Sequence, residues 1–393
     1  YVGHDNSKED FVMSDWYVMW SEDLVHWQVK KILDRKDTYM KEDSTDCWAC
    51  DCVQSPWDGK YYLYYSNRNI DTGVAVCERP DGSFVDARLK KPLIPKGLTT
   101  TSSYDPDIIL PDEKDPHAYI LFGCCDYYAM QLDESMINVV PDTLRHVAVY
   151  PSDGTTDELE GVLRSDQPEA CFIEGRWYLY WAGRYAVSDN RFGPYIFHSN
   201  IGKEIPQYPD GRCFIDHGSF VKWHGQWFYA VTRGIETPFY RQSWLLYLHV
   251  CDDGTLMIDE TIRRCGVGQY CAQWEKIEAE WYMSIEDGLR KVELKENNKH
   301  SGFALLQESG NNSAQFPHIY DLPENPVMTL QLKGRRGAKV EVLIDEEPAG
   351  KIELKKDEAN FIQISLPLII NSGEHDFKLV FTGYVVLDWF SFK

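Results

Sequence analysis

Four titratable side chains stand at similar places in a repeated part of this sequence. They lie a short way upstream of turns that lead into aromatic, apolar segments, and they are Asp51, Asp105, Glu169 and His217. Carboxyl groups and imidazoles can donate or accept a proton, so several of them in one pocket are typical of general acid–base catalysis. Burial and a neighbouring negative charge raise the pKa of a carboxyl group and keep it protonated near neutral pH. The pattern therefore predicts one acid–base site.

The segments after these residues recur at a nearly constant spacing. Tyr61 and Tyr119 are 58 positions apart, Tyr119 and Trp177 are also 58 apart, and Trp177 and Trp227 are 50 apart. Each segment follows a turn dipeptide with glycine or proline, and the four are residues 60–65, 117–122, 176–181 and 226–230. A repeat of this length built from strands and turns predicts the blades of a β-propeller. The first strands of the blades surround one axis, so the four side chains are expected to converge there.

The size and charge of the chain limit its class. A chain of 393 residues is long enough for two domains. Forty basic and 62 acidic side chains give a net charge of −22, which opposes binding to nucleic acid and to anionic membranes. No run of 18 apolar residues occurs, so no membrane span is predicted.

The cysteines indicate a reducing compartment. There are 11, an odd number, and none lies in the last 120 or so residues. Cys47, Cys50 and Cys52 resemble half of a zinc site, but no second cysteine pair at zinc spacing follows them, so we predict no metal there. The first residues show neither a basic region nor an apolar signal sequence. We therefore expect a cytoplasmic protein.

Alternating apolar residues and scarce helical periodicity predict an all-β protein. The propeller-like repeats extend over residues 1–262, and residues 263–275 are predicted to be a linker. Residues 276–393 show short strands separated by turns, a pattern typical of a β-sandwich.

Several motifs in residues 1–262 together resemble glycoside hydrolase family 43, a family of five-bladed β-propellers. They are Asp105-Pro106 before the segment 119–123 (YILFG), Glu169 before 177–180 (WYLY), Trp48-Ala49 before 59–64 (GKYYLY), His217-Gly218-Ser219 before 225–227 (GQW), and 21–27 (SEDLVHW). The resemblance implies a glycosidase that inverts the anomeric carbon. Such an enzyme needs an acid that protonates the leaving oxygen and a base that activates water.

The resemblance also implies roles for individual residues. Glu169 is the general acid and Asp105 is the aspartate that tunes its pKa. His217 matches a histidine beside a cation or water cluster on the axis, and Arg241 matches an arginine that faces the tuning aspartate. His4 and Asp5 border the sugar pocket, together with Trp48. Asp51 is either a sugar contact or a structural hydrogen-bond acceptor.

The catalytic base of the family is expected upstream of Tyr1, because the first residues resemble the strand that follows it. Asp5 is a less favoured replacement for this base. One alternative function is therefore a catalytically inactive, carbohydrate-binding homologue that lacks the base. The residue types upstream of Tyr1 in the parent gene would distinguish the two functions. A propeller that serves as a scaffold for protein contacts is a second alternative, and it predicts no convergence of carboxyl groups.

Residues 276–393 resemble a family-6 carbohydrate-binding module, a jelly-roll sandwich. The segments that carry this likeness are 277–280 (IEAE) and 387–392 (LDWFSF). The resemblance implies a structural calcium bound by Glu278, Glu280 and Asp388, since hard cations prefer oxygen ligands. The sugar-binding signature of the module is weaker here, because Val386 replaces a common asparagine. A sandwich that binds no sugar is therefore an equal alternative.

The favoured function is removal of arabinofuranosyl or xylosyl units from plant cell-wall oligo- or polysaccharides, with no cofactor required for the chemistry. Long aromatic loops at residues 4–20 and 126–136 could close one end of a groove, which favours exo attack. The sequence gives no oligomeric state.

Overall fold

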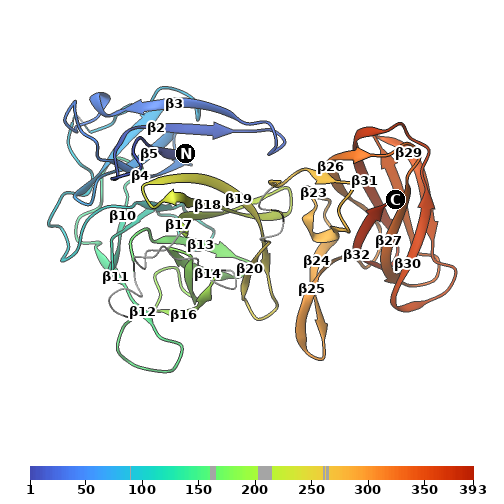
Figure 1. The fold of residues 1–393 in the computed structure, drawn as a ribbon. Coiled ribbons are helices and arrows are strands. Elements are labelled where there is room, and N and C mark those ends of the chain that lie inside the picture. Colours follow the sequence, from blue (N-terminus) through green and yellow to red (C-terminus); the bar gives the residue numbers. More distant parts are fainter. Residues whose placement is uncertain (89, 160–164, 202–214, 260–261, 263–264) are drawn as a thin grey trace. The chain divides into compact units, whose positions relative to one another are not determined.

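The computed structural model describes residues 1–88, 90–159, 165–201, 215–259, 262 and 265–393 (Figure 1). Its regular structure there is almost entirely β-strand, which confirms the all-β prediction. Two short 3₁₀-helices accompany the strands, η1 (Arg35–Asp37) and η4 (Ala279–Trp281). Within the described ranges, no helix has the length and apolar character needed to cross a membrane.

Contacts divide the chain into two compact units. The N-terminal unit consists of residues 1–22, 27–220 and 230–244, and the C-terminal unit consists of residues 23–26, 221–229 and 245–393. The predicted domain boundary at residue 262 lies within the C-terminal unit. Part of the predicted linker, Tyr270 and Cys271, forms strand β21 and pairs in parallel with β26, while residues 263 and 264 of that linker lie outside the described ranges.

Five sheets follow one another along residues 2–258, and four of them are simple antiparallel meanders in chain order. The first two sheets are β1 (Val2–Asp5), β2 (Met13–Trp20) and β3 (Gln28–Asp34), and then β4 (Cys47–Gln54), β5 (Tyr61–Asn67), β6 (Asp71–Cys77) and β7 (Val85–Asp86). The third is β8 (Asp107–Ile109), β9 (Tyr119–Phe122), β10 (Tyr127–Gln131) and β11 (Arg145–Val147).

The fourth sheet is β13 (Glu169–Ile173), β14 (Arg176–Trp181), β15 (Arg184–Ser188) and β16 (Tyr195–Asn200), with β12 (Val149–Tyr150) parallel to β16 at its edge. The fifth is β17 (Ile215–Trp223), β18 (Gln226–Thr237), β19 (Tyr240–Val250) and β20 (Leu256–Ile258). The four repeated segments of the sequence are therefore β5, β9, β14 and β18, each the second strand of its sheet. The first strands β4, β8 and β13 neighbour one another in that order.

Aromatic side chains fill the space between successive sheets. Tyr64 and Tyr65 point to opposite faces of β5, and both are fully buried. Tyr64 belongs to a hydrophobic cluster with Phe122 of the next sheet, whereas Tyr65 packs in a cluster with Trp16 of the preceding sheet. Burial on both faces explains why the repeated segments are apolar throughout. It also shows that these aromatic residues form the core.

The predicted long loops at residues 4–20 and 126–136 are largely strands. Residues 2–5 and 13–20 form the paired strands β1 and β2, and residues 127–131 form β10. Aromatic residues of both segments, such as Trp16 and Tyr127, therefore lie in β-strands and not in loops. Exo attack stays a prediction.

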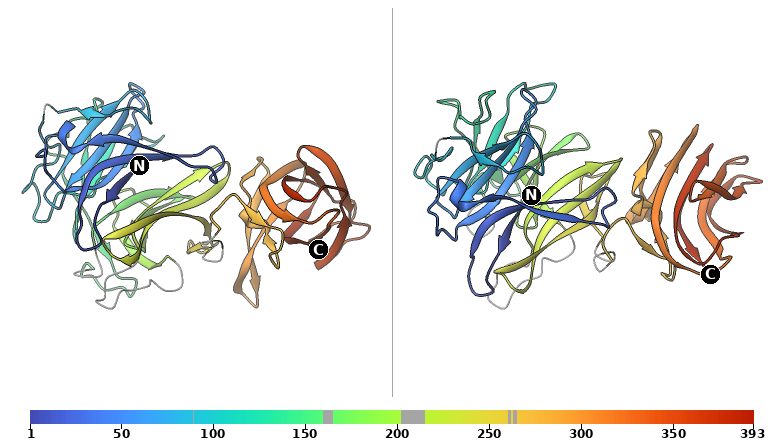
Figure 2. Two further views of the ribbon diagram at one scale, coloured as in Figure 1. Left: turned by 45° about the horizontal axis from the view of Figure 1, so that its top comes forward. Right: turned by 90° about the horizontal axis from the view of Figure 1, so that it is seen from above.

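The C-terminal unit contains two six-stranded sheets that share one hydrophobic cluster (Figures 1 and 2). One is β21 (Tyr270–Cys271), β26 (Asn311–Leu322), β31 (Gly373–Thr382), β28 (Lys339–Ile344) and β29 (Glu347–Glu353), with β23 (Ser284–Ile285) paired to β26. The other is β24 (Leu289–Glu296), β25 (Lys299–Gln307), β32 (Val385–Phe392), β27 (Val327–Gly334) and β30 (Glu358–Pro367), with β22 (Ile277–Glu278) paired to β32. Strict alternation of buried residues in β27 and β28 directs one face of each sheet into the cluster.

Candidate functional site

Three carboxyl groups occupy equivalent positions on the first strands β4, β8 and β13. Asp51, Asp107 and Glu169 lie opposite Tyr64, Leu121 and Tyr180 of the second strands. We call these three the inner carboxyls. Each retains partial solvent exposure.

Each inner carboxyl accepts a hydrogen bond from the backbone of the next first strand. Asp51 accepts from the N–H of Ile108 at 2.8 Å, and Asp107 accepts from that of Ala170 at 2.9 Å. Glu169 accepts from the N–H of Phe220 at 2.9 Å. The inner carboxyls therefore accept hydrogen bonds from backbone N–H groups of the next sheet, and these bonds link successive sheets.

The inner carboxyls are also close enough to raise one another's pKa. Burial, followed by the charge of Asp107, raises the pKa of Glu169 well above its usual value, while the bond from Phe220 opposes this shift. Burial and the charge of Asp51 likewise raise the pKa of Asp107 well above its usual value. Burial also raises the pKa of Asp51. A carboxyl group in this setting holds its proton at a higher pH than a solvated one, as a general acid requires.

Asp105 lies two residues before the position that the repeat predicts for it. The residue equivalent to Asp51 and Glu169 is Asp107, whereas Asp105 precedes β8 in a left-handed conformation with φ of +55°. Only 3% of Asp105 is exposed. Its backbone N–H donates to Ser66 Oγ at 2.9 Å, and that hydroxyl donates to Asp105 Oδ1 at 3.5 Å. Asp107, and not Asp105 as the repeat predicted, therefore occupies the position equivalent to Asp51 and Glu169.

A second set of side chains lies three positions before the inner carboxyls. Trp48, Tyr104 and Asp166 occupy this position in the three sheets. The rings of Trp48 and Tyr104 meet edge to face with centroids 6.2 Å apart, and the Tyr104 hydroxyl donates to Asp166 Oδ2 at 3.1 Å. Ser165 Oγ also donates to Asp166 Oδ1 at 3.0 Å. We call Trp48, Tyr104 and Asp166 the outer group.

Asp105 and Asp166 both act on the hydroxyl of Tyr104. Burial, then the charges of Asp105 and Asp166, raise the pKa of Tyr104 far above its usual value. The hydroxyl groups of Tyr104 and Ser165 both donate to the Asp166 carboxyl group. Sequence reasoning missed Asp166. Its offset from Glu169, the same as that of Trp48 from Asp51, was the available signal.

The predicted sugar-binding residues of the first sheet make close polar contacts. Arg241 donates to Asp5 through its backbone N–H at 2.8 Å, through Nε at 3.0 Å and through an NH2 group at 2.8 Å. The guanidinium also lies over the ring of Phe11, 5.2 Å from its centroid, and Phe11 contacts Trp48. His4 Nδ1 lies 3.1 Å from Asp15 Oδ1. The structure therefore connects Asp5, Arg241 and Trp48 through Phe11.

His217 lies on β17, the first strand of the fifth sheet, and is partly exposed. Its carbonyl oxygen accepts a hydrogen bond from Thr232 Oγ1 at 3.2 Å. Its position fits the predicted place on a first strand, and its metal role remains a prediction.

The predicted calcium ligands are electrostatically coupled. Burial raises the pKa of Glu280 well above its usual value, and the charge of Glu278 adds to this shift. Glu280 Oε2 is buried without a hydrogen-bond partner among the described residues. Lys276 Nζ lies 2.6 Å from Glu278, and Asp388 Oδ2 accepts from Gln331 Nε2 at 2.7 Å.

Comparison with known proteins finds one family model that is similar to part of this chain. Residues 4–161 match the model of the family described as "Glycosyl hydrolases family 43". The matched range contains the first three sheets with Asp51, Asp105 and Asp107, and it ends before Glu169 and His217. Among curated proteins, none matches this chain.

Solved structures of family 43 enzymes are similar in fold. A family 43 arabinoxylan arabinofuranohydrolase from Bacillus subtilis, in complex with cellotetraose, aligns with 100% of this chain and 91% of its own, with a TM-score of 0.53 and 15% identity. The GH43_1 enzyme from Xanthomonas citri, complexed with xylotriose, aligns with 65% of this chain and 85% of its own, with a TM-score of 0.54 and 22% identity.

A third structure is CoXyl43, a GH43 β-xylosidase/α-arabinofuranosidase from a compost microbial metagenome, in complex with xylotriose. It aligns with 65% of this chain and 87% of its own, with a TM-score of 0.52 and 20% identity. At these identities the similarities establish a common fold and leave the activity of this chain to be inferred from its site.

Proposed function

We propose that this protein is a glycoside hydrolase that removes arabinofuranosyl or xylosyl units from plant cell-wall oligo- or polysaccharides, with inversion at the anomeric carbon. The observation that carries the proposal is Glu169, a partly exposed carboxyl group whose pKa is raised by burial and by Asp107. The match of residues 4–161 to the family 43 model supports the reaction class. The xylotriose and cellotetraose bound to similar structures support a carbohydrate substrate.

We also propose an architecture for the two units. The five sheets are the blades of a five-bladed β-propeller, and the first strands β4, β8 and β13 with their inner carboxyls line its axis. The two sheets around the common cluster of the C-terminal unit form a β-sandwich. Burial of both faces of β5 and the neighbouring first strands support the propeller.

In the proposed mechanism Glu169 is the general acid. Its proton passes to the glycosidic oxygen as the bond to the anomeric carbon breaks, so the leaving alcohol departs neutral. A water molecule attacks the opposite face of the sugar and gives its proton to a general base. Burial and, after it, the negative charge of Asp107 raise the pKa of Glu169 and favour its protonated form. Asp105 acts on the outer group through its charge near Tyr104.

The outer group and its neighbours provide the surface that holds the sugar. The rings of Trp48, Tyr104 and Phe11 offer apolar faces, and Asp166 offers carboxylate oxygens for sugar hydroxyls. Arg241 fixes Asp5 with a fork of two side-chain bonds. Because Asp5 is held in this way, we assign it to positioning of the site.

We also propose a structural calcium bound by Glu278, Glu280 and Asp388 of the C-terminal unit, as the family resemblance implies. Glu278, Glu280 and Asp388 supply oxygen ligands, and the unpartnered buried oxygen of Glu280 offers a place for a cation. Calcium would supply positive charge to this acidic region and take no part in hydrolysis.

The test compares Glu169→Gln with Asp166→Asn, in residues 1–393 and in the same chain extended upstream with residues of the parent gene. Loss of the acid should slow hydrolysis of arabinosyl and xylosyl oligosaccharides about 10²–10⁴-fold, and should slow an activated nitrophenyl glycoside far less. Asp166→Asn should slow hydrolysis of both kinds of substrate by a similar factor, because it weakens sugar binding. If Asp166→Asn shows the leaving-group dependence and Glu169→Gln does not, the role of acid belongs to Asp166. The configuration of the first product, measured by NMR, tests inversion.

The second candidate is an inactive carbohydrate-binding homologue. It is favoured by the end of the family match at residue 161, before Glu169, and by the engagement of Asp5 by Arg241. In that case the extended chain hydrolyses no glycoside, yet it binds xylotriose, and Trp48→Ala abolishes the binding.

A further inference from the structure

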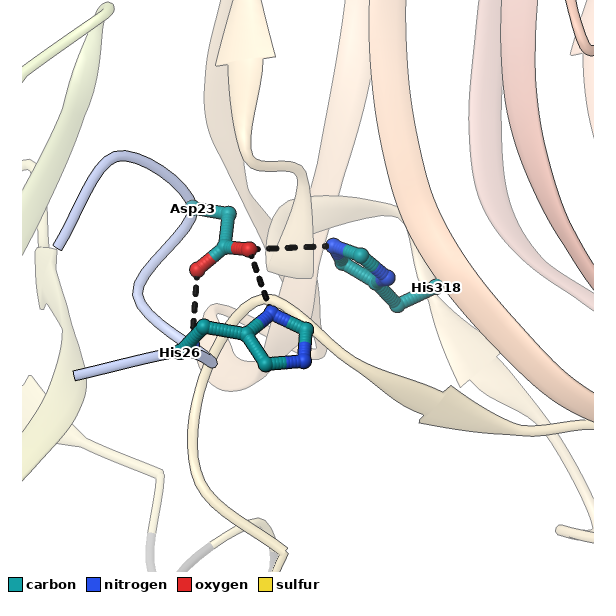
Figure 3. Close-up of side chains that lie close together, drawn as sticks. All are labelled: Asp23, His26 and His318. Atoms are coloured by element: carbon teal, nitrogen blue, oxygen red, sulfur yellow. Dashed lines mark hydrogen bonds and ion pairs between the residues drawn. The ribbon is translucent and has the colours of Figure 1, made fainter.

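One carboxylate and two imidazoles form a cluster that shares no residue with the candidate site. All three belong to the C-terminal unit, and Figure 3 shows them facing one another. Asp23 Oδ2 lies 2.7 Å from His26 Nδ1 and 3.6 Å from His318 Nε2. The two imidazole rings meet edge to face with centroids 5.7 Å apart. The ligand atoms of the three residues all lie within 4.8 Å of one another.

The side chains of this cluster are oriented by a second layer of hydrogen bonds. Asp23 Oδ1 accepts from the backbone N–H groups two and three residues further on, at 2.9 Å and 2.8 Å, which directs Oδ2 toward the imidazoles. His318 Nδ1 lies 2.7 Å from Glu374 Oε1. If Nδ1 carries the proton and donates to Glu374, the lone pair of Nε2 faces Asp23. A carboxylate on the outer nitrogen of a histidine is the arrangement that orients metal-binding imidazoles.

The backbone at His318 is held in an uncommon conformation. Its φ is +51°, in the left-handed region that a residue with a Cβ rarely adopts. The backbone N–H of His318 donates to Asp376 Oδ1 at 2.9 Å, and this bond helps to hold the conformation. Observed backbone outliers of this kind occur often at ligand sites. This conformation places the imidazole beside Asp23.

We propose that Asp23, His26 and His318 bind one divalent transition metal ion, with Zn²⁺ as the preferred ion. Imidazole nitrogens with one carboxylate oxygen are typical ligands of zinc, whereas calcium and magnesium prefer oxygen alone. Ligand atoms at about 2.0–2.1 Å from a tetrahedral ion lie roughly 3.3 Å apart. The two measured distances from Asp23 Oδ2, 2.7 Å and 3.6 Å, bracket this value. A water molecule would complete the four ligands.

Metal binding here joins segments far apart in the sequence. Asp23 and His26 lie in the turn between β2 and β3, and His318 lies on β26. An ion bound by all three closes a loop of nearly 300 residues, and an ion that binds only the folded state stabilises it. The proposed ion therefore has a structural role. Its binding can be measured from its effect on the stability of the protein, with no activity assay.

Among the residues that the structure describes, two other clusters could contribute background metal binding, and the test must separate them. They are Cys251 with Glu293 and His300, and Asp126 with His146 and Glu158. In the first, Lys295 Nζ lies 3.3 Å from Glu293 Oε2, so a cation is already present beside the carboxylate. Cobalt bound there would show a sulfur charge-transfer band, which the proposed site cannot give.

The experiment titrates the chelator-stripped chain with Zn²⁺ by calorimetry and with Co²⁺ by absorption. The variants are His26→Gln, His318→Gln and Glu374→Gln. The matched control is His117→Gln, because His117 Nδ1 lies 2.9 Å from Asp115 in a similar exposed pair that no third His, Cys, Asp or Glu joins within the described ranges. The wild type and His117→Gln should bind one more Zn²⁺ per chain than His26→Gln and His318→Gln. Glu374→Gln should bind the same number about 10–100-fold more weakly.

Zinc should also raise the urea midpoint of the wild type and of His117→Gln, and leave that of His26→Gln unchanged. His26 is exposed over 76% of its side chain, so this variant should fold even if His318→Gln does not. Equal zinc stoichiometry in His26→Gln and His117→Gln, or a sulfur-type cobalt band as the sole spectral signal, would overturn the proposal.

Discussion

At the scale of single residues, two aspartates two positions apart have different surroundings. Asp105 is almost fully buried, takes a left-handed backbone conformation and binds Ser66. Asp107 lies on β8, keeps partial exposure and is the main charge acting on Glu169. Burial is the largest cause of the raised pKa of Glu169, and the charge of Asp107 is the next.

Asp107→Asn is therefore expected to move the basic limb of the pH–rate profile to lower pH. Removing a negative charge lets Glu169 ionise earlier, so the fraction of protonated acid falls at a lower pH. The asparagine oxygen can still accept the N–H of Ala170, so the fold should be kept. The measurement is kcat/KM against pH for an arabinosyl or xylosyl substrate.

Asp105→Asn is the matched control for this prediction. It removes the same charge from a carboxyl group that acts on Tyr104, so its effect on the basic limb should be smaller. A larger shift for Asp105→Asn than for Asp107→Asn would return the tuning role to Asp105, where the family resemblance puts it.

The sequence predicted that Glu169 lies on a first strand. It did not predict that Asp107 and Asp166 belong to the same site. The family motif Asp105-Pro106 led to the prediction that Asp105 is the residue that tunes the pKa of Glu169. Strand β8 begins only at Asp107, because Asp105 has a positive φ. Asp166 was not predicted because Trp48 and Tyr104, which occupy the same position in the preceding sheets, are aromatic residues and not carboxylates. Hydrogen bonds from Tyr104 and Ser165 became visible only in three dimensions.

At the scale of elements, the second strands were predictable and the connections between sheets were not. β5, β9, β14 and β18 combine aromatic runs with turn dipeptides, and these local signals suffice to locate a strand. The bonds from an inner carboxyl to the next first strand join residues 51 to 63 positions apart. No local pattern encodes such a partner.

Asp51 tests the structural part of these bonds. Asp51→Ala removes the acceptor of the Ile108 N–H, and an unsatisfied buried donor costs about 1–3 kcal/mol. Asp51→Asn keeps an acceptor and removes a carboxyl group whose pKa is raised by burial, so it should be neutral or stabilising at pH 7. Urea unfolding of the two variants measures the difference.

This pair also decides the role that the sequence left open for Asp51. A structural acceptor predicts lower stability for Asp51→Ala than for Asp51→Asn, with similar sugar binding in both. A sugar contact predicts equal stabilities and weaker binding of xylotriose in both variants.

At the scale of the whole molecule, the two units differ in how well local patterns described them. The strands of residues 276–393 were expected from alternation, and β27 and β28 show it. Strand β21 lies within the predicted linker and was not expected. It has only two residues, too few to show the alternation of apolar and polar residues that indicates a strand. The contact division falls inside β19, so Leu245 to Val250 of this strand belong to the C-terminal unit.

The last prediction concerns calcium and the stability of the whole chain. Glu278 and Glu280 are coupled acidic groups, and Glu280 Oε2 is buried without a hydrogen-bond partner among the described residues. If calcium binds there, a concentration one hundred times its Kd should raise the free energy of unfolding by about 2.7 kcal/mol. Glu280→Gln should lose this gain and should be at least as stable as the wild type without calcium, because a buried negative charge is removed. The control is Glu308→Gln, which alters an exposed ion pair with Arg290 and should keep the full calcium effect. Urea unfolding with calcium and with chelator measures all three chains, and an equal calcium response in Glu280→Gln and Glu308→Gln would rule out Glu280 as a ligand.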